Sequence, residues 1–139
     1  MNHSIVIDRQ VGLILVSAHG VASMEGIQSY IADLMKPPCS EVKFNMLTDF
    51  RDVDMRGLSA DDVRNVAWLV RQRLDEVLAV KHAVVVSQPL SFGFARMYQS
   101  LNDQVDPQDF KIFYDIDEAR EWVCSGERGK GAPIAEKET

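Results

Sequence analysis

Residues 80–101, VKHAVVVSQPLSFGFARMYQSL, pass from a strand pattern to a helix pattern within a few positions. The nearly continuous apolar run before Ser87 is typical of a central strand covered on both faces. After the loop, apolar side chains recur at helical spacing: Phe94, Met97, Tyr98 and Leu101. We therefore expect a helix from about Phe92 to Gln104. A buried strand followed directly by an amphipathic helix predicts a parallel α/β sheet.

The same alternation continues toward the N-terminus. SIVID (4–8) and GLILVSAHG (12–20) are short apolar runs joined by a polar turn around Val11, which predicts an antiparallel hairpin. SMEGIQSYIADLM (23–35) predicts a helix with Ser23 as its N-cap, and VKFNMLTDF (42–50) predicts a strand. From Ser59 a long helix is indicated by the apolar face formed by Val63, Val66, Ala67, Val70, Leu74, Val77 and Leu78.

Toward the C-terminus, FKIFYD (110–115) predicts a short strand and DIDEAREWVCSG (115–126) a last helix. The predicted order is β-β-α-β-α-β-α-β-α. It favours a single α/β domain over residues 1–124, with a largely parallel sheet, helices packed on it and the first strand antiparallel at an edge. Residues 125–139 are rich in glycine and charge, so we expect a flexible tail.

Composition narrows the function classes. The 139 residues contain 15 Lys and Arg against 21 Asp and Glu, a net charge of −6. Nucleic-acid backbones and anionic membranes would be repelled on average, so neither is an expected partner. Cys39, Cys124 and the three scattered histidines have no metal-ligand spacing, and we expect no metal and no cofactor. The N-terminus lacks the pattern of a signal peptide or membrane anchor, which favours a cytoplasmic protein.

Four segments carry a resemblance to a known family: FNMLTDFRDVD (44–54), HAVVVS (82–87), SFGFARMYQSL (91–101) and FKIFYDIDEAREWV (110–123). Together they resemble the SpoIIAA-like family of small bacterial proteins, relatives of the anti-sigma-factor antagonist (STAS) and Sec14 lipid-binding folds. The resemblance covers nearly all of residues 4–124. It implies the α/β fold. It implies no activity.

One feature of the anti-sigma-factor antagonists is missing. Their Asp-Ser-Ser-Gly turn, in which the first serine is phosphorylated, corresponds here to Gly57-Leu58-Ser59-Ala60. Ser59 followed by Asp62 has the form of a capping box, in which the hydroxyl accepts a hydrogen bond from a backbone N–H at the helix start. We expect this capping role, with phosphorylation of Ser59 as the alternative.

A candidate binding edge follows from the fold class. Ligands of open parallel sheets collect beyond the carboxyl ends of the strands. The segments that reach this edge and the helix that starts there contain the candidate site residues Asp49, Arg51, Ser87, Ser91, Phe92, Gly93 and Arg96. Ser91 is expected to cap the helix starting at Phe92, Gly93 to allow close approach, and Arg51 and Arg96 to favour an anion. The alternative is a junction that only turns the chain.

The sequence contains no arrangement typical of an enzyme. It has no Ser-His-Asp order, nucleophile elbow or phosphate loop, and His82 is interpreted as a packed or edge residue. We therefore expect a non-enzymatic regulatory or protein-interaction domain. The alternative is a domain that binds a small ligand, either an anion at the strand ends or an apolar molecule under the helix that contains Phe92. Trp68 falls outside the apolar face of its helix and is a candidate interface residue, with a homodimer as one outcome.

Overall fold

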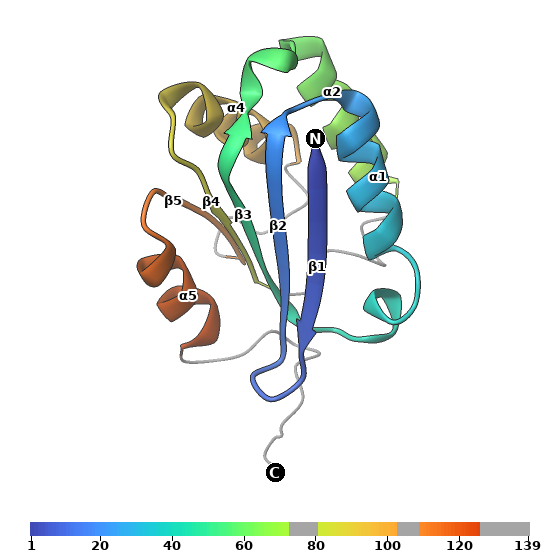
Figure 1. The fold of residues 1–139 in the computed structure, drawn as a ribbon, viewed down its shortest axis with the longest axis vertical. Helices are drawn as coiled ribbons and strands as arrows, with labels where there is room; N and C mark the ends of the chain where they lie inside the picture. The colour runs from blue at the N-terminus through green and yellow to red at the C-terminus, as the bar shows by residue number, and fades with distance from the viewer. Residues whose placement is uncertain (73–80, 103–108, 126–139) are drawn as a thin grey trace.

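The computed structural model describes residues 1–72, 81–102 and 109–125. Within them a five-stranded sheet has the strand order β1-β2-β3-β4-β5, so every strand lies beside its neighbours in the sequence (Figure 1). The strands are β1 (Asn2–Asp8), β2 (Leu13–Val21), β3 (Asn45–Asp54), β4 (His82–Val85) and β5 (Phe110–Phe113). The helices are α1 (Met24–Leu34), α2 (Ala60–Arg71), α4 (Pro89–Leu101) and α5 (Ile116–Cys124), with short 3-10 turns η1 (Cys39–Glu41) and η2 (Met55–Gly57).

The predicted α/β fold is confirmed. β1 pairs antiparallel with β2, and the three following pairs are parallel. The hairpin closes over a turn in which the Gly12 N–H donates to the Asp8 carbonyl at 3.0 Å, with Gly12 at φ 69°. A positive φ is readily adopted only by glycine, which explains why the short connection ends there.

Helices cover both faces of the sheet (Figure 1). Tyr30 of α1, Leu58 before α2 and Tyr98 of α4 pack against one face of the sheet around Phe50 and Val84. The opposite face contributes a separate cluster that includes Leu47 and Val85 and packs against α5. Successive residues of a strand point to opposite faces, and Val84 and Val85 follow that rule in the two clusters.

β3 is longer than predicted. The expected strand ended at Phe50, but the observed strand continues to Asp54. The extension is paired with the end of β2, where His19, Gly20 and Val21 lie opposite Asp52, Val53 and Asp54. Cross-strand pairing therefore overrides the turn tendency of the polar segment Arg51–Asp54.

Side chains cap the helices largely as the sequence indicates. Ser23 accepts from the Gly26 N–H at 3.0 Å, as predicted for α1. Ser59 and Asp62 form the predicted capping box at α2, and Asp115 caps α5. The predicted core positions Leu74, Val77 and Leu78, the helix end at Asp103 and Gln104, and residues 126–139 of the predicted tail lie outside the described residues.

Candidate functional site

A cleft lies at the carboxyl end of β3, at the edge where the sequence predicts a site. It has a volume of about 580 Å³. Its lining comes from the end of β3, from η2 and from the first turn of α4: Arg51, Asp52, Val53, Asp54, Met55, Arg56, Gln88, Pro89, Leu90 and Ser91. Ser87 is not among the lining residues, but its hydroxyl donates to the carbonyl of the lining residue Arg51 at 2.7 Å.

The arginines of this cleft are already paired with carboxylates. Arg51 binds Asp49 in a bidentate ion pair, with its Nε 2.9 Å and a terminal nitrogen 2.8 Å from the two carboxylate oxygens. Arg56 binds Asp54 in the same way. Hydrogen bonds from Arg56 lower the pKa of Asp54 to about 2, and those from Arg51 lower the pKa of Asp49. Because both guanidinium groups face carboxylates, an anion would have to compete with Asp49 and Asp54 for them.

The helix beside the cleft begins earlier than predicted, and Ser91 is not its N-cap. α4 starts at Pro89, and the residue at its N-cap position is Gln88, whose side chain makes no capping hydrogen bond. Proline is favoured at the first helical position because its missing N–H would have no helical partner there and its fixed φ suits a helix. Ser91 lies within the first turn and is 1% exposed.

Of the other predicted residues of α4, Phe92 is partly buried and packs against the core, whereas Gly93 and Arg96 are exposed. Phe92 stacks on Tyr114, with ring centroids 5.3 Å apart and planes 3° apart, and Arg96 lies over the Phe92 ring at 6.0 Å. Gly93 is exposed and has no atom within 4 Å of the place where a Cβ would stand. The structure thus brings Arg51 and Ser91 together in the cleft, whereas Phe92, Gly93 and Arg96 are not among its lining residues.

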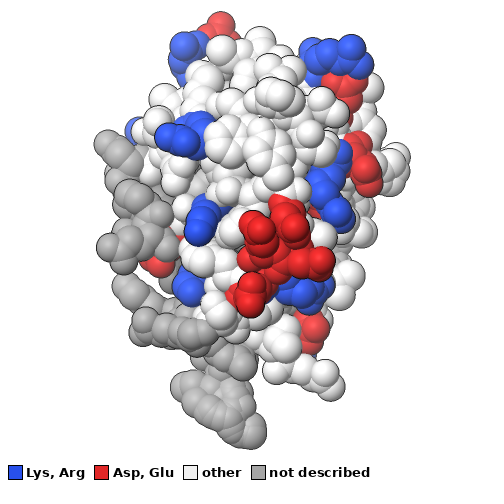
Figure 2. Space-filling view, turned by 90° about the vertical axis from the view of Figure 1, so that its left-hand side faces the viewer, with Lys and Arg blue, Asp and Glu red and all other residues white. Residues whose placement is uncertain are grey.

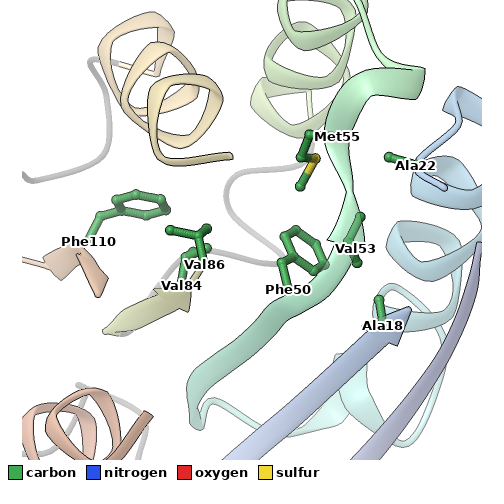
Figure 3. Packing of buried hydrophobic residues seen from close by; sticks show 8 residues of the cluster. All are labelled: Ala18, Ala22, Phe50, Val53, Met55, Val84, Val86 and Phe110. Carbon is green, nitrogen blue, oxygen red and sulfur yellow. The ribbon is translucent and has the colours of Figure 1, made fainter. Parts of the chain in front are cut away.

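A second hollow, which we call the core cavity, lies between the sheet and the helices α1, α2 and α4. Its volume is about 100 Å³. Sheet residues of its wall are Thr48, Phe50, His82, Val84, Val86 and Phe110; the helices and their connections add Ile27, Tyr30, Met55, Leu58, Val63, Val66, Val70, Ser91, Phe94, Ala95 and Tyr98. Figure 3 shows Phe50 and Phe110 on either side of Val84 and Val86, on the sheet face toward α2 and α4. An apolar ligand under α4 is one of the alternatives that the sequence indicates, but the cavity itself is not predictable from the sequence.

The wall of the core cavity is apolar but contains a few polar atoms. The Oγ of Ser91 and the Nδ1 of His82 are buried, and neither has a hydrogen-bond partner within the described part of the chain. Burial lowers the pKa of His82 to about 4, because desolvation penalises the imidazolium form. Burial also raises the pKa of the hydroxyls of Tyr30 and Tyr98. At neutral pH the lining therefore contains no charged side chain.

The cleft and the core cavity share two wall residues, Met55 and Ser91. Met55 follows the end of β3 in η2, and Ser91 stands in the first turn of α4. These two side chains are thus a common boundary between an outer polar cleft and an inner apolar space.

Comparison with solved structures identifies a protein of similar architecture. It is an uncharacterised protein of the DUF3478 family from Shewanella loihica PV-4, described as having a SpoIIAA-like fold. The two structures match with a TM-score of 0.57 over 88% of this chain and 94% of the other, at 21% sequence identity. The chain has a SpoIIAA-like fold. No protein-family model matches the chain, and no curated protein matches it.

In this SpoIIAA-like fold, Ser59 lies at the start of α2. Its Oγ accepts from the Asp62 N–H at 3.1 Å, and its own N–H donates to the Asp62 carboxylate at 2.9 Å. The predicted capping box is therefore present. Phosphorylation of Ser59 stays a prediction, and a phosphate on this hydroxyl would have to replace the cap.

Trp68 lies on the outer side of α2 in the SpoIIAA-like fold. It is 62% exposed, the largest exposed fraction among the large apolar side chains that the structure describes. Its neighbour Leu69 is partly buried and packs beside Val66 and Val70. The predicted position of Trp68 outside the apolar face is thus observed, while its role in an interface stays a prediction.

Charge on the SpoIIAA-like domain is mixed. Figure 2 shows the side where β5 and α5 lie, with acidic side chains gathered in one patch and Lys and Arg scattered around it. This face presents no continuous basic surface to a phosphate backbone. Among the described residues, no group of three or more His, Cys, Asp or Glu side chains could hold a metal ion. No helix in these segments has the length and apolar character needed to cross a membrane.

Proposed function

We propose that this domain binds a small apolar molecule in the core cavity and catalyses no reaction. The observation that carries the proposal is the cavity itself, a space of about 100 Å³ between the sheet and three helices. Protein interiors normally pack to the density of organic crystals, so an unfilled volume of this size is costly. An apolar cavity of roughly 150 Å³ in another protein stays dry and takes up benzene, which is the same order of size.

The composition of the wall supports this proposal over an anion site. Burying an ion away from water is strongly unfavourable unless it is paired, and the cavity wall contains no side chain that would pair with one. In the outer cleft, Arg51 and Arg56 are held by Asp49 and Asp54. A neutral apolar ligand meets neither obstacle.

The experiment is a two-dimensional NMR titration with toluene. We expect saturable shifts at residues of the core cavity in the wild type. Ala95→Leu, which adds volume to the cavity wall, should abolish them. Ala32→Leu, the same change on the exposed side of α1, is the matched control and should retain them. The absence of saturable shifts in the wild type up to the solubility of toluene would refute the proposal.

A regulatory or protein-interaction domain is the second candidate. The specific observation in its favour is Trp68, because a largely exposed tryptophan on a helix is typical of a contact surface. The two candidates use different parts of the molecule, α2's outer side and the space beneath α4. A ligand-binding domain that signals through Trp68 would combine them.

A further inference from the structure

We infer that the ligand of the core cavity is a neutral single-ring aromatic molecule with one hydroxyl group, a compound of the phenol class, bound with its hydroxyl at Ser91. The inference rests on the proposed function, since it specifies what the same cavity takes. Three features of the wall carry it: its size and aromatic lining, its lack of charge, and the unpartnered hydroxyl of Ser91.

Size and lining favour one aromatic ring. A volume of about 100 Å³ has no room for a lipid tail or a nucleotide. Five aromatic side chains contribute to the wall: Tyr30, Phe50, Phe94, Tyr98 and Phe110. Aromatic rings prefer edge-to-face or offset contacts with other rings, and Tyr30 and Phe50 already make one such contact at 5.8 Å. A ring inserted among them would extend this packing.

Ser91 supplies the polar contact. Its side chain is almost fully buried, and its Oγ has no hydrogen-bond partner among the described residues. Leaving a buried hydroxyl unpaired costs roughly 1–3 kcal/mol, so a ligand atom that bonds to it recovers part of that cost. A serine hydroxyl both donates and accepts, and it therefore matches a phenolic hydroxyl in either direction.

The position of Ser91 sets the orientation of the ligand. Ser91 and Met55 separate the core cavity from the outer cleft. The second unpartnered atom, Nδ1 of His82, belongs to the first residue of β4, whereas Ser91 follows the carboxyl end of that strand. The four residues of β4 span three rises, roughly 10 Å, so a hydroxyl that stays at the Ser91 end does not reach Nδ1 at the other end. A molecule that enters past Met55 therefore leaves its hydroxyl at Ser91 and inserts its ring toward Val84 and Phe110.

The charge of the wall excludes the carboxylate analogues of such a ligand. All lining residues are uncharged at neutral pH, and burial keeps His82 in the neutral form. A benzoate anion would lose its hydration in the cavity without finding a cation to pair with. A phenol has an ordinary pKa near that of the tyrosine side chain, so it enters as the neutral molecule.

The test compares phenol with toluene, which have the same size and differ in one group, on the wild type and on Ser91→Ala. We expect phenol to bind about three- to tenfold more weakly to Ser91→Ala, the range of one hydrogen bond, while toluene binds with unchanged or higher affinity. Ser100→Ala, an exposed serine of the same helix, should change neither affinity. Ser91→Cys, which keeps the volume, replaces Ser91→Ala if that variant does not fold.

The outcomes separate this inference from the proposed function. If toluene saturates the cavity but Ser91→Ala leaves the affinity for phenol unchanged, the hydroxyl contact is wrong and the apolar site stands. Tight binding of benzoate would also overturn the inference, because it requires a charge partner. If neither toluene nor phenol binds to the wild type, both proposals fail.

Discussion

The Nε2 atom of His82 lies 2.9 Å from the Oγ1 atom of Thr48, across the parallel strands β4 and β3. Thr48 is 1% exposed, and the edge of the Phe110 ring packs on the imidazole with centroids 5.3 Å apart. The partly buried imidazole is therefore held between a hydroxyl and an aromatic ring. This environment favours the neutral form of His82 over the imidazolium form in the folded state.

A pH dependence of stability follows from this environment. Burial lowers the pKa of His82 from 6.5 to about 4. Between these values the unfolded chain binds a proton that the folded chain does not bind. The stabilising contribution of neutral His82 to the free energy of unfolding is therefore complete above pH 6.5 and is lost as the pH falls to 4. The loss is on the order of 3 kcal/mol.

Urea unfolding at pH 7.5, 6, 5 and 4 measures this loss. His82→Gln should flatten the dependence over this range, since glutamine does not titrate. His19→Gln replaces an exposed histidine and should leave the slope in place. If the free energy of unfolding of His82→Gln depends on pH as that of the wild type does, the loss of stability comes from other titrating groups.

The substitution of glycine by alanine is expected to change stability in opposite directions at Gly93 and Gly57. Gly93 is exposed within α4, and a Cβ there would meet nothing within 4 Å. Gly93→Ala should therefore raise the free energy of unfolding by about 1 kcal/mol, the difference in helix propensity. At Gly57 a Cβ would overlap the Ala22 carbonyl oxygen and lie 2.8 Å from the Val21 Cγ1. Gly57→Ala should destabilise, and chemical denaturation of both variants checks the two signs.

Gly93→Ala also tests the predicted binding edge. If a ligand or partner approaches the first turns of α4 as closely as the sequence analysis expects, the added methyl group will weaken its binding while the domain becomes more stable. Equal binding by the wild type and Gly93→Ala would remove Gly93 from the predicted site residues.

The capping box at Ser59 predicts a loss of stability on its removal. Ser59→Ala deletes the acceptor of the Asp62 N–H and should lower the free energy of unfolding by about 1 kcal/mol. Ser59→Asp keeps an acceptor at the N-cap and should retain most of the stability. Ser100→Ala on the exposed side of α4 is the control. If Ser59→Ala and Ser100→Ala have the same stability, the cap contributes nothing to folding.

Trp68 predicts self-association. If the outer side of α2 is a dimer contact, the wild type sediments as a dimer and Trp68→Ala dissociates with a Kd at least about tenfold higher. Val6→Ala, which truncates another exposed apolar side chain, should sediment as the wild type does. Sedimentation of the wild type as a single chain at all concentrations would exclude the homodimer.

The fold was predictable because its signals are local. Apolar runs, helical spacing and the serine caps at Ser23 and Ser59 depend on neighbouring residues only. Two element boundaries were predicted wrongly, the start of α4 and the end of β3. The helix expected from about Phe92 begins at Pro89, because proline is favoured at a first helical position. The end of β3 was missed because its partner, the end of β2, lies far away in the sequence.

The candidate site was only partly predictable. The edge beyond β3 and β4 follows from the topology, and Arg51 and Ser91 do lie there. The pairing of Arg51 with Asp49 depends on side-chain geometry that spacing does not reveal. The core cavity was missed because its volume depends on how side chains from seven elements and two connections fit together. Periodicity identifies which residues face inward, such as His82, Val84 and Val86 at alternate positions, but not whether they fill the space.

The strand order β1-β2-β3-β4-β5 has a consequence for synthesis on the ribosome. Each strand that emerges can pair with the strand before it, and the hairpin of β1 and β2 is the most local of these pairings. The sheet face formed by Leu13, Leu47 and Val85 is covered by α5. The nine residues of α5 are the last element of the described chain to be synthesised. Until α5 emerges, the nascent sheet exposes that apolar face to water, so this interval is when the chain is most open to aggregation and to chaperone binding.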